Sequence, residues 1–326
     1  MRLYVTGGTG FVGSNIIKVA LERYNAAVFS TVYSSLPEGA PGLEYGRVNM
    51  LDPQQVRNSV GTFQPNAIIH AAILNNFERM YQDRTLAWQA YVDSTRFLVR
   101  AANAVGAKII LVSSDWVFDG TQVEADEFTP PNPINLYGVL KLVAETVVME
   151  TAENGAVARV SAVNGVHWFQ PNLPLSQNVG LGNLIPAVVN ALQRGQRFTV
   201  WEGNINMHAT PGLASDCAEM MLRIIQRDCR GIFHCCCGQS VSRMELANAA
   251  AEIFGLDAEL LQTGPPDWTG MVGVPVPFNT SMSARYTAEQ LDYTLPNISR
   301  LLQIYHQQLE TGRLENSELR KRHGNH

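Results

Sequence analysis

The stretch TGGTGFVG, Thr6–Gly13, connects a short apolar run, Arg2–Val5, to a segment with helical apolar spacing, Phe11–Arg23. A strand, a glycine-rich turn and a helix in this order are typical of a dinucleotide-binding unit. Glycines permit the tight turn and a close approach of the backbone to a pyrophosphate, which then faces the N–H groups at the positive end of the helix. The residues that we expect to contact the cofactor here are Gly7, Thr9, Gly10, Phe11, Val12 and Gly13.

The first half of the chain repeats this alternation of apolar strands and helices. Strands that are apolar throughout and separated by helices indicate a parallel sheet covered on both faces. The sequence therefore predicts an α/β fold, a Rossmann-type doubly wound parallel sheet. The further strands are expected at Ala26–Tyr33, Ala67–Ala72, Lys108–Ser113 and Val157–Val163, and the further helices at Pro53–Phe63, Thr85–Val105 and Leu136–Glu153.

The composition changes after about Asn164. His167–Asn183 and Gly264–Pro277 are rich in glycine, proline and polar residues, which predicts long loops, and helices are expected at Leu213–Gln226 and Arg243–Phe254. We expect residues 1–165 to form the dinucleotide-binding domain, with about 205–238 returning to it. Residues 166–315 would form mainly a smaller C-terminal substrate-binding lobe, and residues 316–326 a solvated, flexible tail.

The bulk composition restricts the class of partner. The formal net charge is −5, which disfavours nucleic acid, and no apolar run approaches the roughly 20 residues that span a bilayer. The first residues do not resemble a signal peptide, so we expect a cytoplasmic protein without a membrane partner. The five cysteines lack a CxxC pair, and three of them lie in a predicted buried strand, Gly231–Gly238. Reduced thiols, and no metal site, are expected.

The end of the second predicted strand bears on the choice of cofactor. In NAD-binding proteins an acidic residue at this point hydrogen-bonds the adenosine ribose. The segment Phe29–Ser35 contains no acid, and its hydroxyl groups, including those of Tyr33 and Ser34, can bond a 2′-phosphate. The sequence therefore favours NADP(H), with NAD(H) as the alternative.

Tyr137 and Lys141 share one face of a predicted helix, because four residues separate them. A nearby lysine ammonium lowers the pKa of a tyrosine, which is ordinarily about 10. The pair can therefore protonate an alkoxide during ketone reduction, or act as a base in the reverse direction. The preceding buried strand ends in Ser113-Ser114-Asp115, so we expect a serine hydroxyl at the same sheet edge, bonded to a substrate carbonyl. This serine, Tyr137 and Lys141 form the predicted catalytic group.

Three motifs together resemble one known family. TGGTGFVG, VSSDWVFDG at Val112–Gly120 and YGVLKLVAE at Tyr137–Glu145 are similar to the extended short-chain dehydrogenase/reductases of the NAD-dependent epimerase/dehydratase superfamily. Within it, SSDWVFDG followed by NPINLYGVLKLVAE looks most like the dTDP-4-dehydrorhamnose reductase group. The resemblance implies Ser-Tyr-Lys catalysis, with Ser114 at the position of the family's catalytic serine or threonine, Tyr137 as the acid and Lys141 as its partner. It also implies a C-terminal substrate lobe and a reductase acting on a 4-keto sugar nucleotide or a similar polar small molecule.

The resemblance also implies roles for individual residues. Asn49 and Met50 fall where the family contacts adenine, and Ala71 and Ala72 where it passes the ribose and pyrophosphate. The residues expected to face the substrate are Ile73, Asp115, Trp116, His167 and Trp168. One departure is that many nucleotide-sugar enzymes place an arginine for the substrate diphosphate in the segment that is here Asn204–Thr210, which contains neither arginine nor lysine.

Several alternatives remain open at the level of sequence. They are a ketoreductase that tailors a small natural product, a sugar-nucleotide epimerase or dehydratase, and a non-catalytic NADP-binding regulatory subunit, since the regulatory subunit of methionine adenosyltransferase resembles the same group. Analogy with related folds also suggests a homodimer that packs Thr85–Val105 and Leu136–Glu153 into a four-helix interface.

Overall fold

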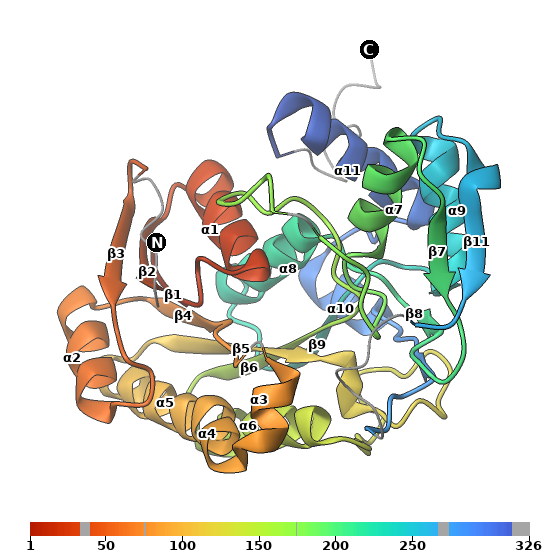
Figure 1. The fold of residues 1–326 in the computed structure, drawn as a ribbon. Helices are drawn as coiled ribbons and strands as arrows, with labels where there is room; N and C mark the ends of the chain where they lie inside the picture. Colours follow the sequence, from red (N-terminus) through yellow and green to blue (C-terminus); the bar gives the residue numbers. More distant parts are fainter. Residues whose placement is uncertain (33–39, 75, 174, 267–273, 315–326) are drawn as a thin grey trace.

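The computed structural model describes residues 1–32, 40–74, 76–173, 175–266 and 274–314. Tyr33, Ser34, the predicted tail and residues 267–273 of one predicted loop lie outside the described residues. The molecule has two unequal parts, a layered part around a central sheet and a smaller part beside its carboxyl edge (Figure 1). The first part contains the N-terminal 160 residues together with α8, β9 and α10, which return to it from later in the chain.

A seven-stranded parallel sheet forms the centre of the larger part, in the order β3-β2-β1-β4-β5-β6-β9. The direction of the strand order reverses between β1 and β4, which is the position where ligands bind in doubly wound sheets. The predicted Rossmann-type fold is therefore confirmed. The strands are β1 (Arg2–Thr6), β2 (Ala27–Val32), β3 (Leu43–Arg47), β4 (Ala67–His70), β5 (Lys108–Ser114), β6 (Gly155–Val160) and β9 (Gly231–Cys235).

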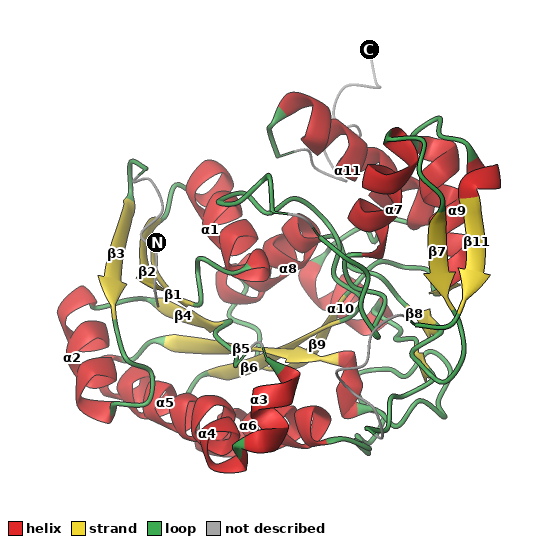
Figure 2. Cartoon of the chain, in the orientation of Figure 1, coloured by secondary structure: helices red, strands yellow, loops and turns green. Residues whose placement is uncertain are grey.

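Helices cover both faces of this sheet, so its central strands are buried on both sides (Figure 2). On one face lie α1 (Phe11–Tyr24) and α8 (Ala214–Gln226), with α10 (Arg285–Leu291) beside α8. On the other face lie α2 (Pro53–Phe63), α5 (Ser94–Val105) and α6 (Leu136–Thr151). A π-helical turn, Gln89–Asp93, joins α4 (Arg84–Trp88) to α5, and α3 (Phe77–Gln82) precedes them.

The smaller part has its own apolar core, in which α7, α9 and α11 pack together. A two-stranded sheet and a three-stranded sheet complete it. Its helices are α7 (Leu184–Gln193), α9 (Arg243–Ile253) and α11 (Ile298–Thr311), and its strands are β7 (Phe198–Trp201), β8 (His208–Ala209), β10 (Val241–Ser242), β11 (Leu261–Gly264) and β12 (Asn279–Thr280).

The predicted elements agree with the structure in type, and several differ in extent. The predicted strand Val157–Val163 begins two residues earlier, at Gly155, and ends at Val160, because the chain turns away at Ser161 toward the second part. The helix predicted as Thr85–Val105 contains the π-helical turn. Sequence patterns did not identify β3, α3, α7, α10 and α11 or the small strands.

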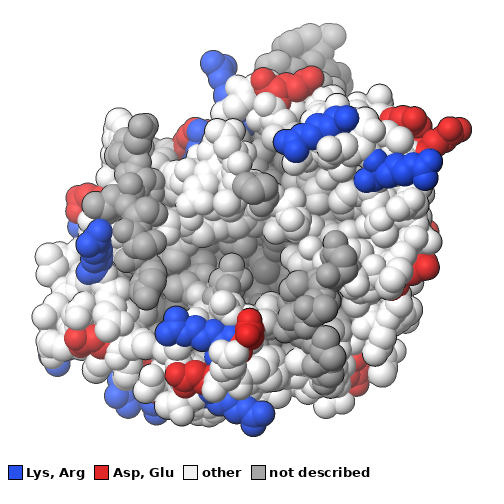
Figure 3. Space-filling view, in the orientation of Figure 1, with Lys and Arg blue, Asp and Glu red and all other residues white. Residues whose placement is uncertain are grey.

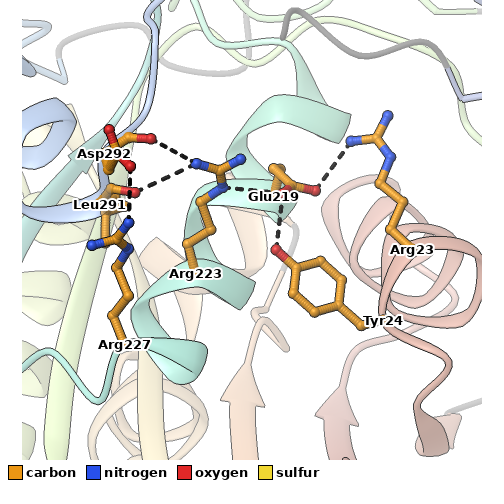
Figure 4. A network of polar contacts seen from close by, with 7 residues as sticks. All are labelled: Arg23, Tyr24, Glu219, Arg223, Arg227, Leu291 and Asp292. Atoms are coloured by element: carbon orange, nitrogen blue, oxygen red, sulfur yellow. Dashed lines mark hydrogen bonds and ion pairs between the residues drawn. The ribbon is translucent and has the colours of Figure 1, made fainter. Parts of the chain in front are cut away.

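A buried polar network joins α1 to α8 on the outer side of the sheet (Figure 4). Glu219, which is 4% exposed, accepts hydrogen bonds from Tyr24, Arg23 and Arg223 at 2.8, 3.1 and 3.2 Å. Arg223 also donates to the backbone oxygen of Asp292. The helix that follows the glycine turn is therefore fixed to a helix that the chain forms two hundred residues later.

Candidate active site

The glycine turn between β1 and α1 is packed too closely for side chains. Gly7 has a φ of +68°, and a Cβ on it would lie 2.7 Å from Cα of Ala72. A Cβ on Gly13 would lie 2.2 Å from the carbonyl oxygen of Gly7. Gly10 caps α1 without a side-chain hydrogen bond, and the first turn of the helix has no acidic residue. The N–H groups at this helix end are therefore left for an anion, and the turn fits a dinucleotide pyrophosphate.

Ala71 and Ala72 lie across this turn, directly after β4. The Ala72 N–H donates to Thr6 Oγ1 at 3.2 Å, and Thr6 Oγ1 is 2.7 Å from Nδ1 of His70. Burial lowers the pKa of His70 to about 3, so this ring is neutral and serves as a hydrogen-bonding support. Asn49 and Met50 follow the carboxyl end of β3, at the same sheet edge, where Asn49 is exposed. Gly7–Gly13, Asn49–Met50 and Ala71–Ala72 thus follow the carboxyl ends of β1, β3 and β4, at one edge of the sheet.

Ser114, Tyr137 and Lys141 come together beyond the end of β5. Ser114 is the last residue of that strand, while Tyr137 and Lys141 lie on the first turns of α6, which begins after the cap Asn135. Lys141 Nζ donates to the backbone oxygen of Val112 at 2.8 Å and lies 5.9 Å from the centroid of the Tyr137 ring. The lysine is thereby held under the tyrosine by the strand that carries the serine.

Aromatic rings surround the Tyr137 ring. Tyr91, Phe77 and Trp116 contact it with centroid separations of 6.0, 5.4 and 5.8 Å. Burial raises the pKa of Tyr137 to about 12, against the effect of its hydrogen bond with Ser114. Burial also lowers the pKa of Lys141 to about 8, against the effect of the Glu145 carboxylate. The expected lowering of the tyrosine pKa by the lysine is therefore not found, because burial outweighs it. At neutral pH the tyrosine is protonated and the lysine is mostly charged.

Asp115 is buried next to the serine and joins the two parts of the molecule. Its carboxylate accepts hydrogen bonds from Ser114 at 2.9 Å, from Ser161 at 2.8 Å and from Thr280 of β12 at 2.5 Å. Burial raises the pKa of Asp115, while these three hydrogen bonds oppose the shift. The serine hydroxyl is consequently oriented, because its proton is directed at Asp115 and its lone pairs remain available for Tyr137 and for the N–H of Trp116.

A cavity of about 480 Å³ opens beside these residues, between the two parts. Within the described residues its lining contains no lysine or arginine, and the only charged side chain is Asp115. Figure 3 shows a hollow with uncharged surface, and charged side chains toward the rim of this face. The lining residues are Ile73, Leu74, Phe77, Tyr91, Ser114, Asp115, Trp116, Tyr137, Val160, Ala162, Val163, Ser176, Gln177, Asn178, Val179, Gly180, Gly182, Asn183 and Trp201.

Three of the five substrate residues expected from sequence, Ile73, Asp115 and Trp116, line this cavity. His167 and Trp168 do not belong to the described lining. Trp168 Nε1 donates to Asn15 of α1 at 2.9 Å, and the His167 ring lies 6.1 Å from that of Phe11, between centroids. The structure therefore places both residues against the helix of the dinucleotide turn.

Sequence reasoning missed much of the cavity wall. The segment Ser176–Asn183 lies in a predicted long loop, but no pattern identified its individual residues, and Phe77 lies in a helix that was not predicted. Trp201 gave no signal, since it ends a short strand in a part of the fold that sequence did not resolve. These residues meet at the cavity only through the packing of the two parts.

The remaining predictions about the site concern absences. The described cysteines are free thiols, and four of the five are buried. Among the described residues, no group of three histidine, cysteine or acidic side chains is placed to hold a metal ion. No helix within the same residues has the length and apolar character needed to cross a membrane.

The fold and the Ser-Tyr-Lys group together define an extended short-chain dehydrogenase/reductase, as the sequence motifs predicted. More specifically, the chain belongs to the family described as the RmlD substrate binding domain, whose sequence profile matches residues 1–309. The predicted resemblance to the dTDP-4-dehydrorhamnose reductase group is thereby confirmed at the level of the family.

The individual proteins that this chain resembles include a subunit of an enzyme, a reductase and an epimerase. Methionine adenosyltransferase 2 subunit beta of Bos taurus is 28% identical over 283 residues, which cover 86% of this chain and 80% of that protein. A dTDP-4-dehydrorhamnose reductase from Bacillus anthracis, solved in complex with NADP, superposes with a TM-score of 0.75 at 20% identity and covers 95% and 98% of the two chains. A UDP-glucose 4-epimerase from Thermus thermophilus, complexed with NAD, has the same TM-score and identity and covers 95% and 99%. These structural likenesses show the fold.

Proposed function

We propose that this protein is an NAD(P)H-dependent reductase that transfers a hydride to the ketone of a 4-keto sugar nucleotide or a similar polar small molecule. The observation that carries the proposal is the position of Ser114 and Tyr137 in the wall of a cavity, with Lys141 buried behind them, at the carboxyl edge of the parallel sheet. A module that only binds a dinucleotide does not require a tyrosine and a lysine in this arrangement.

Ser114, Tyr137 and Lys141 have different roles in the reduction of the substrate carbonyl. When substrate binds, the Ser114 hydroxyl turns its proton from Asp115 to the carbonyl oxygen, and Tyr137 delivers its own proton to that oxygen as negative charge develops. The Lys141 ammonium favours loss of the proton from the tyrosine. When bound, the dinucleotide supplies the hydride to the carbonyl carbon. The rings of Tyr91, Phe77 and Trp116 limit access of water to the tyrosine hydroxyl.

NADP(H) is the favoured cofactor, with NAD(H) as the alternative. The described part of β2 ends at Val32 and contains no acidic residue that would repel a 2′-phosphate. The first turn of α1 is likewise free of acidic residues. Relatives of this fold have been solved with NADP and with NAD.

The uncharged lining of the cavity supports two narrower candidates for the substrate. A natural-product ketone would suit the aromatic and aliphatic wall, because such a molecule needs no cation. A sugar nucleotide would use the side-chain amides of Asn178 and Asn183. Epimerase or dehydratase activity is the remaining enzymatic alternative, since the same fold carries an epimerase.

A second function, that of a non-catalytic regulatory subunit, is favoured by a different observation. Relatives that match 86% of the chain at 28% identity are named methionine adenosyltransferase 2 subunit beta. A subunit of this kind would bind the dinucleotide and a partner enzyme without turning over a ketone.

NADPH and NADH oxidation with dTDP-4-dehydrorhamnose, followed at the nicotinamide absorbance, distinguishes the two functions. We expect turnover with NADPH, and at least a ~10³-fold loss in Tyr137→Phe, which removes the proton donor and keeps the ring. Turnover that survives in Tyr137→Phe would overturn the mechanism. NADPH binding without turnover of this or other ketones, together with binding to a methionine adenosyltransferase, would favour the subunit function.

A further inference from the structure

Arg243 is a fully buried arginine behind the cavity wall. It is the first residue of α9, and its side chain is 0% exposed. The guanidinium donates from Nε to the backbone oxygen of Asn206 at 2.7 Å and from Nη2 to that of Asn178 at 2.6 Å, and its Nη1 is 3.5 Å from Oε1 of Gln177. Within the described residues no carboxylate forms an ion pair with it. Burying a cation without a carboxylate partner is costly, which requires an explanation.

The tertiary structure brings Arg243 next to the segment Asn204–Thr210, which contains no arginine or lysine of its own. Strands β8 and β10 pair antiparallel, with Ser242 opposite His208, and so place Arg243 against Asn206 in the segment Asn204–Thr210. The absence of arginine and lysine from that segment therefore does not leave this side of the cavity without positive charge.

A peptide group that belongs to the cavity wall accepts a hydrogen bond from this cation. Asn178 and Val179 both line the cavity, and the Asn178 carbonyl is the one that accepts from Arg243. A trans peptide directs its C=O and N–H in opposite directions, so the Val179 N–H points away from Arg243. Within the described residues this N–H donates to no other group. A cation bonded to the carbonyl polarises the peptide and strengthens the N–H as a donor.

A second donor lies beside it. Trp116 lines the cavity, and its Nε1 would lie 3.3 Å from a Cβ built on Gly180, the residue after Val179. No hydrogen bond among the described residues uses this Nε1. The Trp116 ring is 5.8 Å from that of Tyr137, between centroids, so this second donor belongs to a side chain that contacts the reacting tyrosine.

We infer that the Val179 N–H and Trp116 Nε1, with Arg243 behind them, form a subsite for an oxyanion of the substrate, a phosphate or a carboxylate. This inference deepens the proposed function, because it concerns the substrate of the same cavity. Arg243 is a positioning residue, which acts on the anion through the Asn178–Val179 peptide and fixes the segment through Gln177. Gln177 in turn donates to the backbone oxygen of Thr199 at 2.6 Å, next to the strand end that carries Trp201.

Calorimetric titration of the full-length chain, with and without NADPH, tests the subsite. The probes are dTDP against thymidine for a phosphate, and glucuronate against glucose for a carboxylate. The variants are Arg243→Gln, Arg243→Lys and Trp116→Phe, which keeps the ring and removes the Nε1 donor. The matched control is Arg227→Gln, because Arg227 forms an exposed ion pair with Asp292 on the outer surface.

In at least one of the two probe pairs, we expect the anionic probe to bind at least ~10-fold more tightly than its uncharged partner. This preference should be present in the unsubstituted chain and in the control variant. Arg243→Gln should abolish that preference, and Arg243→Lys and Trp116→Phe should reduce it. The pair that shows the preference identifies the anion as phosphate or carboxylate. If Arg243→Gln does not fold by circular dichroism, the other two variants decide.

Equal binding of the members of both pairs, or a preference that is unchanged in every folded variant, would overturn the subsite. The binding readout does not depend on turnover. A chain that shows the Arg243-dependent preference but never oxidises NADPH would contradict the proposed reaction and retain the subsite. A chain that reduces ketones but does not prefer the anionic probe would retain the proposed reaction and contradict the subsite.

Discussion

At Gly13 the space for a side chain is occupied by the chain itself, since a Cβ there would lie 2.2 Å from the oxygen of Gly7 and 2.7 Å from Cα of Gly8. We expect Gly13→Ala to displace the turn and to weaken NADPH binding by about tenfold or more, measured by nicotinamide fluorescence. Gly61→Ala is the matched control, because a Cβ at Gly61 of α2 meets nothing within 4 Å. It should leave NADPH binding unchanged and raise stability by about 0.5–1 kcal/mol. Equal affinities in the two variants would contradict the role of the turn.

The protonation of Lys141 sets the expected pH dependence of reduction. Burial lowers its pKa to about 8, whereas the pKa of Tyr137 is raised to about 12, so the lysine loses its proton first as the pH rises. We expect kcat/KM for ketone reduction to be constant below this pH and to fall above about 8, because the neutral amine no longer favours proton transfer from the tyrosine. Lys141→Arg, which stays charged, should have lower activity without this fall. If kcat/KM of Lys141→Arg falls with rising pH as it does in the unsubstituted chain, the fall arises from another titrating group.

Helices α1 and α8 show how a buried polar group joins elements that are distant in sequence. Glu219 is the shared acceptor for Arg23, Tyr24 and Arg223 (Figure 4). We expect Glu219→Gln to destabilise the protein by about 1–3 kcal/mol, because the charge-assisted hydrogen bonds are lost in a buried setting. Urea unfolding followed by circular dichroism measures this change.

Glu22→Gln provides the surface comparison for that variant. Glu22 pairs with Lys18 at 2.6 Å on α1, but both side chains are partly exposed, and such pairs contribute about 0–1 kcal/mol. Each variant removes one paired carboxylate, which is buried at Glu219 and partly exposed at Glu22. Equal destabilisation by both would show that the network adds nothing beyond a surface ion pair.

Local signals predicted some elements accurately and left others unrecognised. The predicted helix Pro53–Phe63 has the observed bounds, because Asp52 caps its first N–H groups and proline occupies its first position. The helix Leu184–Gln193 is short, consists almost entirely of apolar residues and contains Pro186, and no side-chain cap marks its start. The strand Leu43–Arg47 is a partly exposed edge strand with a glycine, which shows neither alternation nor a continuous apolar run. Tertiary packing stabilises both.

The exposed apolar side chains of α4 and α6 bear on the assembly of the whole molecule. Trp88, Val139 and Met149 are 45, 40 and 40% exposed on these helices, which belong to the predicted four-helix interface. We expect a homodimer of twice 35.9 kDa in light scattering, and a monomer for the double variant Trp88→Glu and Val139→Glu. Leu173→Glu, which changes an equally exposed leucine outside these helices, should remain dimeric. A monomeric unsubstituted chain would contradict the predicted interface.

The sequence by itself determined the fold class, the family, the glycine turn and the Ser-Tyr-Lys group, because each depends on residues close together in the chain or at a fixed spacing on one element. Ser114 and Tyr137 meet because a strand ends, and the helix that follows it begins, at one sheet edge. Only the tertiary structure decided the cavity wall. Trp201 and Gln177 line it and Arg243 lies behind it, from segments with no shared local signal, and His167 turns instead toward α1. Their positions depend on how the second part packs on the sheet, which is a property of summed long-range contacts and not of any local pattern.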